Sequence, residues 1–158
     1  MNEEKLLALI PRHKSDFERA NRLIRLGYSN VKSILPEIIE WTLDGNWPIA
    51  RRLQDFLICI GKPVAPFIKV ILQNGNSSDK YHLLSGVVAH SNELNVELYS
   101  ELLRMSEFPT KEEISDEIDV KAKEILFACD NNNKRVFNLL PLRPQPEPED
   151  QSSVVEFN

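Results

Sequence analysis

Apolar residues recur every three or four positions along most of the chain, which is the spacing of an amphipathic α-helix. Between residues 31 and 43 the apolar side of one such helix consists of Val31, Ile34, Leu35, Ile38, Ile39 and Trp41. Polar residues fill the opposite side, so this segment is predicted to be an outer helix with one buried face. In the next segment, about residues 48–60, Ile58 lies opposite the main apolar face. We therefore expect an inner helix with neighbours on both sides.

The chain also shows a faint internal repeat with a period of about thirty residues. Leu35-Pro36-Glu37-Ile38 is echoed by Ala65-Pro66-Phe67-Ile68, and Asp44-Gly45-Asn46 is echoed by Asn74-Gly75-Asn76. A repeat of this length is typical of stacked helical hairpins, which bury their apolar faces against their neighbours. The pattern predicts an all-α fold, a short α-solenoid of three hairpins after two N-terminal helices, with about eight helices in total.

Residues with strong preferences for helix ends set the expected boundaries. Pro11 should end a first helix over residues 3–9. Ser15 and Glu18 have the spacing of a capping box, so the second helix should begin at Ser15 and stop at Gly27.

Within the repeat, Pro36 falls on the polar side of its helix and should bend that helix around the core. Asn46 should cap the next helix, with Pro48 in its first turn. Later helices are expected over residues 67–73, 80–89 and 94–105, with Ser77 or Ser78 as the cap of the middle one. A last helix should start from the capping box at Thr110 and carry an apolar stripe of Ile114, Ile118, Ala122 and Ile125.

A change of composition after Cys129 divides the chain into two parts. Residues 1–129 carry the helical pattern, and we expect them to form one helical repeat domain. Residues 130–158 begin with Asp130-Asn131-Asn132-Asn133 and continue into a stretch with Pro141, Pro144, Pro146 and Pro148. Frequent proline and few apolar residues predict an extended, mostly disordered tail.

Charge and composition exclude some classes of function. The net charge of −5 and the pI near 5.3 oppose nucleic-acid binding, which depends on Lys and Arg, and favour a basic protein as partner. No apolar run approaches the roughly 20 residues of a membrane span, and the N-terminus does not look like a secretory signal, so a cytoplasmic protein is expected. Cys59 and Cys129 have no metal-ligand spacing, and neither a metal nor another cofactor is predicted.

Few residues carry candidate chemistry. His13 and Lys14 lie in a turn next to a helix start, which indicates either a small anion site or a solvated turn. His82 and His90 are about 12 Å apart along a helix, too far to share a metal ion. Ser85 follows His82 by three residues, but no acid is placed to orient that histidine. The sequence therefore predicts no catalytic residues.

The turn between the outer and inner helices of the first hairpin has the strongest binding signal. Trp41 and Trp47 flank it and Arg51 follows, a combination found at binding hot spots but also at the closed end of a hairpin. Arg51 could instead reach back to Asp44 and be structural. We expect the contact surface on the inner-helix side and around this turn, with Trp47, Arg51 and Arg52 as anchors, and His13 and Lys14 as outlying residues.

Two segments, residues 9–16 and residues 34–50 with Asp44-Gly45-Asn46-Trp47-Pro48, resemble a bacterial family of small HEAT-like domains of unknown function. The resemblance covers roughly residues 5–126 and brings no catalytic residues. Pro36, Asp44 and Arg51 approximate the broader HEAT pattern, although Arg51 falls one place late. Domains of this kind mostly bind proteins, while some related solenoids act on modified DNA bases or attach pigments.

These observations lead to one preferred hypothesis and three alternatives. The preferred one is a non-enzymatic protein-interaction module. The second is an immunity protein whose acidic surface masks the basic active site of a toxin. The third is a small enzyme, which would need a pocket that gathers His13 or His82 with carboxylates. The fourth is a nucleic-acid-binding solenoid.

Overall fold

The computed structural model describes the backbone of residues 1–139 and the side chains of residues 1–132. This part of the chain is all-helical and contains no strand. Its α-helices are α1 (Glu3–Leu7), α2 (Phe17–Leu26), α3 (Tyr28–Val31), α4 (Leu35–Glu40), α5 (Ala50–Ile60), α6 (Ala65–Asn74), α7 (Ser77–Gly86), α8 (Asn92–Glu97), α9 (Tyr99–Glu107), α10 (Lys111–Ser115) and α11 (Ile118–Leu139). Three 3₁₀ segments are η1 (Lys32–Ile34), η2 (Lys62–Val64) and η3 (Val88–His90). The helices are shorter and more numerous than the eight expected.

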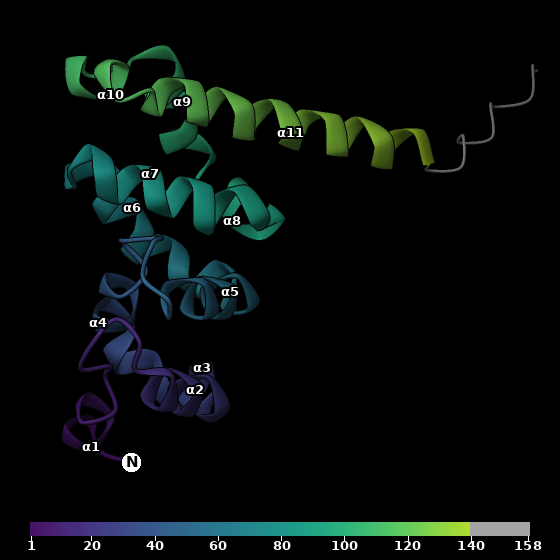
Figure 1. Cartoon of the computed structure of the whole chain (residues 1–158). Coiled ribbons are helices and arrows are strands. Elements are labelled where there is room, and N and C mark those ends of the chain that lie inside the picture. Colours follow the sequence, from purple (N-terminus) through teal and green to yellow (C-terminus); the bar gives the residue numbers. More distant parts are fainter. Residues whose placement is uncertain (140–158) are drawn as a thin grey trace, which may run out of the picture.

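The helices form successive layers that follow the order of the chain (Figure 1). The layer of α1, α2 and α3 lies at one end, and α9, α10 and α11 lie at the other. One continuous cluster of buried apolar side chains runs through the layers from Leu6 to Ile125. α5 packs against both α2 and α4, as expected for a helix with two apolar sides.

The thirty-residue echo reappears as a repeated local structure. η1 leads directly into α4, and thirty residues later η2 leads directly into α6. Pro36 and Pro66 occupy the first turns of these α-helices, where the missing backbone donor costs nothing. The prediction that Pro36 bends a continuous helix over residues 31–43 is therefore wrong, because the helix begins at Leu35 and the segment before it is 3₁₀.

Two predicted helix starts also need correction. Asp16, not Ser15, caps α2, because its carboxylate accepts the N–H groups of both Arg19 and Arg12. The bond from the Arg12 N–H in particular lowers the pKa of Asp16. The Gly27 stop is confirmed, with φ at 77°.

Asn46 does not cap α5, which starts only at Ala50 without a side-chain cap. Instead the Asn46 N–H donates to the Asp44 side chain within the turn. Asn76, at the equivalent place in the second copy, does cap α7: its side chain accepts the Asp79 N–H at 2.8 Å. The cap expected at Ser77 or Ser78 is thus one residue earlier.

In the last third of the fold the helices are shorter and more often interrupted than the apolar pattern predicts. The helix expected over residues 94–105 is two helices, α8 and α9, separated at Leu98. The Thr110 capping box is confirmed, but α10 is short, and Glu117 with φ at 58° separates it from α11. As a result Ile114 is exposed, whereas Ile118, Ala122 and Ile125 are buried.

α11 packs against α9 and α7 and then extends beyond the layers beneath it (Figure 1). It continues to Leu139, ten residues past the boundary predicted at residue 129. The run of Asp and Asn at 130–133 does not end it, since no proline or glycine occurs between Cys129 and Pro141. The rest of the predicted tail, residues 140–158, lies outside the described residues.

Every helix in the described part of the chain is too short or too polar to cross a membrane.

A buried ionic network joins the later helices. Glu113 of α10 is fully buried; it accepts hydrogen bonds from Lys80 of α7 at 2.9 Å and from Arg104 of α9 at 2.8 and 3.1 Å. The Thr110 N–H donates to the same carboxylate. Burial by itself would raise the pKa of Glu113, but the bonds from Arg104, Lys80 and Thr110 outweigh burial and lower the pKa to about 2. The network therefore ties three helices together with paired charges.

Candidate binding site around Trp47

The turn after α4 holds Trp47 in place through local hydrogen bonds. Asp44 accepts two of them, from the Asn46 N–H at its side chain and from the Trp47 N–H at its carbonyl. The Trp47 ring lies 5.2 Å from the Trp41 ring, centroid to centroid, at an angle of 50°. Both rings are half-buried. The tryptophan pair therefore closes the hairpin and also leaves part of its aromatic surface accessible.

A pocket of about 440 Å³ opens beside Trp47, and we call it the Trp47 pocket. It lies between the turn and the first turns of α7. Its lining residues are Glu40, Leu43, Asp44, Asn46, Trp47, Ser78, Asp79 and His82. The two copies of the thirty-residue echo thus meet here, because residues of the turn in the first copy and of α7 in the second line the same pocket.

Three carboxylates make this pocket acidic. Glu40, Asp44 and Asp79 all line it, and none of them forms an ion pair with a cation in the described part of the chain. Arg51, which could have reached Asp44, instead pairs with Asp55 one turn along α5 at 3.4 Å. The negative charge in the pocket is therefore not neutralised from within the fold.

His82 contributes a ring nitrogen with a fixed role. Its Nδ1 atom accepts the Gly45 N–H at 3.2 Å, and a Cβ atom on Gly45 would lie only 2.9 Å from that nitrogen. Glycine is thus required for this close approach. In the neutral ring, Nε2 then carries the proton and acts as a donor. His82 is near carboxylates, as an enzyme would need, but the lone pair that a general base uses is already occupied.

An apolar groove of about 320 Å³ continues from the pocket, and we call it the α4–α6 groove. It is lined by Pro36, Ile39, Glu40, Leu43, Phe67, Val70 and Ile71. Glu40 and Leu43 line both hollows, so the groove and the pocket are adjacent parts of one surface. Val70 has 57% of its surface exposed, so the groove presents apolar surface to solvent.

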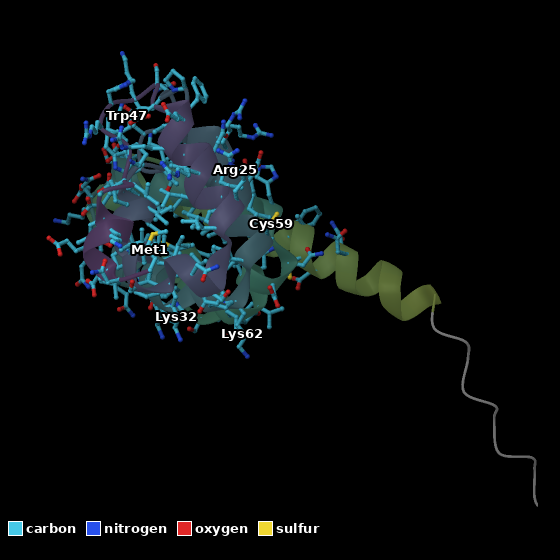
Figure 2. The ribbon with its side chains drawn as sticks, turned by 90° about the horizontal axis from the view of Figure 1, so that it is seen from below. Met1, Arg25, Lys32, Trp47, Cys59 and Lys62 are labelled. Carbon is cyan, nitrogen blue, oxygen red and sulfur yellow. The ribbon has the colours of Figure 1, made fainter. Side chains whose placement is uncertain are left out.

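The structure separates the residues that sequence analysis grouped as one contact surface. Arg52 lies at a second groove, of about 580 Å³, between α2 and α5, where it donates to Asn21 at 2.8 Å and stacks 5.0 Å above the Phe17 ring. Cys59 lines the same groove. Figure 2 shows Cys59 on the side from which α11 projects, whereas Trp47 lies at another edge of the molecule.

His13 and Lys14 are exposed, but they are less distant from the turn than predicted. The Lys14 carbonyl accepts the Ile49 N–H at 3.2 Å, which places this loop against the start of α5. Neither residue lines the Trp47 pocket.

Sequence analysis missed the other components of the site. It assigned no role to Glu40, considered His82 only for a metal ion or an enzyme, and gave Phe67 only a place in a helix over residues 67–73. The thirty-residue offset between the helices that contain Pro36 and Pro66 could have indicated these residues, since equivalent helices of adjacent repeats are expected to lie side by side.

The described residues contain no group of three or more His, Cys, Asp or Glu side chains placed to hold a metal ion.

Comparison with known proteins gives a family but no activity. A search of the curated proteins found no match. One family model, described as a domain of unknown function (DUF5071), matches residues 9–126, which is well over half of the chain and includes every residue of the Trp47 pocket and the α4–α6 groove. The chain belongs to the DUF5071 family.

Proposed function

We propose that this protein is a cytoplasmic, non-enzymatic protein-interaction module, with its hairpins stacked as a short HEAT-like solenoid. Its partner binds to the surface formed by the Trp47 pocket and the α4–α6 groove. The observation that carries the proposal is the continuity of an exposed apolar groove with an acidic, aromatic-lined pocket. The repeated η1–α4 and η2–α6 structures support the solenoid.

The surface has the composition of a protein-binding site. Protein interfaces commonly combine a buried apolar centre with aromatic anchors and a polar rim. Phe67, Val70 and Ile71 provide the apolar part, Trp47 the aromatic anchor, and the carboxylates the rim. The same carboxylates repel phosphate, so the surface suits a protein better than a nucleic acid.

A non-enzymatic role is favoured by the way His82 is held. The Gly45 N–H occupies its acceptor nitrogen, and among the described residues no hydrogen bond joins His82 to Ser78 or Ser85. A binding role requires no free base, and the remaining N–H of the ring can serve as a hydrogen-bond donor to a partner.

The proposal is tested by affinity capture from native lysate at near-normal expression, with two matched variants. Val70→Asp places a charge in the α4–α6 groove, and Val96→Asp places the same charge on α8, at a valine with 67% exposure that does not line the groove. We expect a protein captured by the wild type and by Val96→Asp to be lost with Val70→Asp. Capture of the same proteins by all three forms, or of none by the wild type, would refute the proposal.

A further inference from the structure

We infer that the Trp47 pocket binds an arginine side chain, presented by a short segment of the partner whose neighbouring apolar residues lie in the α4–α6 groove. This inference rests on the proposed function and specifies the chemistry that the same surface recognises.

Charge complementarity identifies a cation as the occupant of the pocket. The three carboxylates come from three separate parts of the fold: Glu40 from the end of α4, Asp44 from the turn, and Asp79 from the first turn of α7. Asp44 and Asp79 also accept local hydrogen bonds, from the Asn46 N–H and the Asn76 side-chain amide, which hold their carboxylates in position. A cation in the pocket would thus meet fixed negative charges on several sides.

Arginine suits this arrangement better than lysine. Its flat guanidinium has five N–H donors that point in several directions, so it can bond to carboxylates that do not lie together. It also stacks on aromatic faces, and Trp47, whose ring lies 5.2 Å from the ring of Trp41, lines the pocket. The ammonium group of lysine is a compact charge that makes less use of a flat aromatic wall.

The partner must also present its backbone to the site. His82 lines the pocket with Nε2 as its donor, because Nδ1 is occupied by the Gly45 N–H. An arginine side chain has no acceptor for that donor. A backbone carbonyl beside the arginine does, which makes a peptide segment a better occupant than a free cation.

The adjacent groove requires apolar neighbours in that segment. Since Glu40 and Leu43 line both hollows, a ligand that fills the pocket passes directly over the groove. There it would cover Phe67, Val70 and Ile71. Burial of this apolar surface supplies affinity, whereas the arginine fixes position and selectivity.

The test is a selection from a displayed library of random peptides of about 12 residues, carried out on the full chain. We expect enriched peptides to share one arginine flanked by large apolar residues. The dominant peptide is then synthesised with a fluorescent label, together with a version in which norleucine replaces arginine, and binding is measured by anisotropy. Two double variants are compared: Glu40→Gln with Asp79→Asn in the pocket, and Glu112→Gln with Asp116→Asn, which makes the same charge change at exposed positions of the last layer.

We expect the pocket variant and the norleucine peptide each to weaken binding about tenfold, with little further loss when they are combined, because both changes remove the same interaction. The variant with changes at Glu112 and Asp116 should bind as the wild type does. Apolar peptides without a cation, bound equally by the wild type and the pocket variant, would overturn the inference and leave the proposed function standing. A selection that enriches no peptide would also overturn it, whereas the proposed function fails only through the Val70→Asp capture experiment.

Discussion

The substitution Glu113→Gln should destabilise the fold in a way that depends on pH. The change keeps the shape of the side chain but removes the charge that Lys80 and Arg104 share. Lys80 is itself 7% exposed, so its ammonium group would remain buried without its partner carboxylate. Removing one member of such a pair typically costs about 3–5 kcal/mol.

The pKa of Glu113 gives an independent magnitude. It falls from an ordinary value of 4.5 to about 2 in the folded protein, so folding favours the ionised form. The stabilisation is fully present above pH 4.5 and is lost as the pH falls through the folded value. At 1.36 kcal/mol per unit the contribution is about 3 kcal/mol at pH 7, about 1 kcal/mol at pH 3 and less than about 1 kcal/mol at pH 2. Both magnitudes are therefore of the order of 3 kcal/mol at neutral pH.

The assay is urea unfolding followed by tryptophan fluorescence, since Trp41 and Trp47 are the two tryptophans of the chain. The free energy of unfolding is compared between the wild type and Glu113→Gln from pH 7 to pH 2. Glu112→Gln is the matched control, because it is the exposed neighbour in the same turn and should change stability by less than about 0.5 kcal/mol. If the difference between the wild type and Glu113→Gln stayed constant over the whole pH range, the ionised carboxylate would not be its source and the reasoning would fail.

Three further predictions, made with four substitutions, test how the helices begin, pack and end. Asn76→Ala should destabilise by about 1 kcal/mol because it removes the α7 cap, and Asn46→Ala should cost less because its side chain caps no helix; equal losses in urea unfolding would contradict the assignment. Ser85→Ala should leave the midpoint of thermal unfolding unchanged or raise it, since the buried hydroxyl has no hydrogen-bond partner, and a clear drop would indicate a missed bond. Gly61→Ala should cost about 1–3 kcal/mol, because φ is 73° and a Cβ atom would collide with the Glu93 carboxylate; wild-type stability by urea unfolding would show that the backbone relaxes there.

Gly86 is a residue whose sequence signal could be explained only by the structure. Its place inside a helix indicates that a neighbour approaches closely. The structure identifies that neighbour as the Gln54 side chain of α5, whose amide nitrogen would lie 2.4 Å from a Cβ atom at position 86. Gln54 in turn donates to the Thr42 carbonyl at 3.2 Å. The sequence indicated the close approach but not which residue makes it.

Local sequence signals predicted most of the helical segments, but they predicted fewer of the residues at which those helices begin and end. The apolar spacing, the Thr110 capping box and the Gly27 stop all act within one or two turns, so they are readable from the chain and are confirmed. Where two neighbouring residues could both cap, as at Ser15 and Asp16, the structure has Asp16 in that role, and its carboxylate also accepts the Arg12 N–H from the preceding loop. The breaks at Leu98 and Glu117 occur without glycine or proline and had no local signal.

The sequence by itself thus determined that the chain is helical, where most apolar faces lie, and that two segments thirty residues apart share a local structure. Only the tertiary structure decided which side chains meet. Lys80 reaches Glu113 across 33 residues, and His82 reaches Gly45 across 37 residues to complete the Trp47 pocket. The physical reason is that helix formation depends on neighbours three or four residues away, whereas a pocket forms from the relative rotation and spacing of packed helices. That arrangement depends on how the whole core is filled.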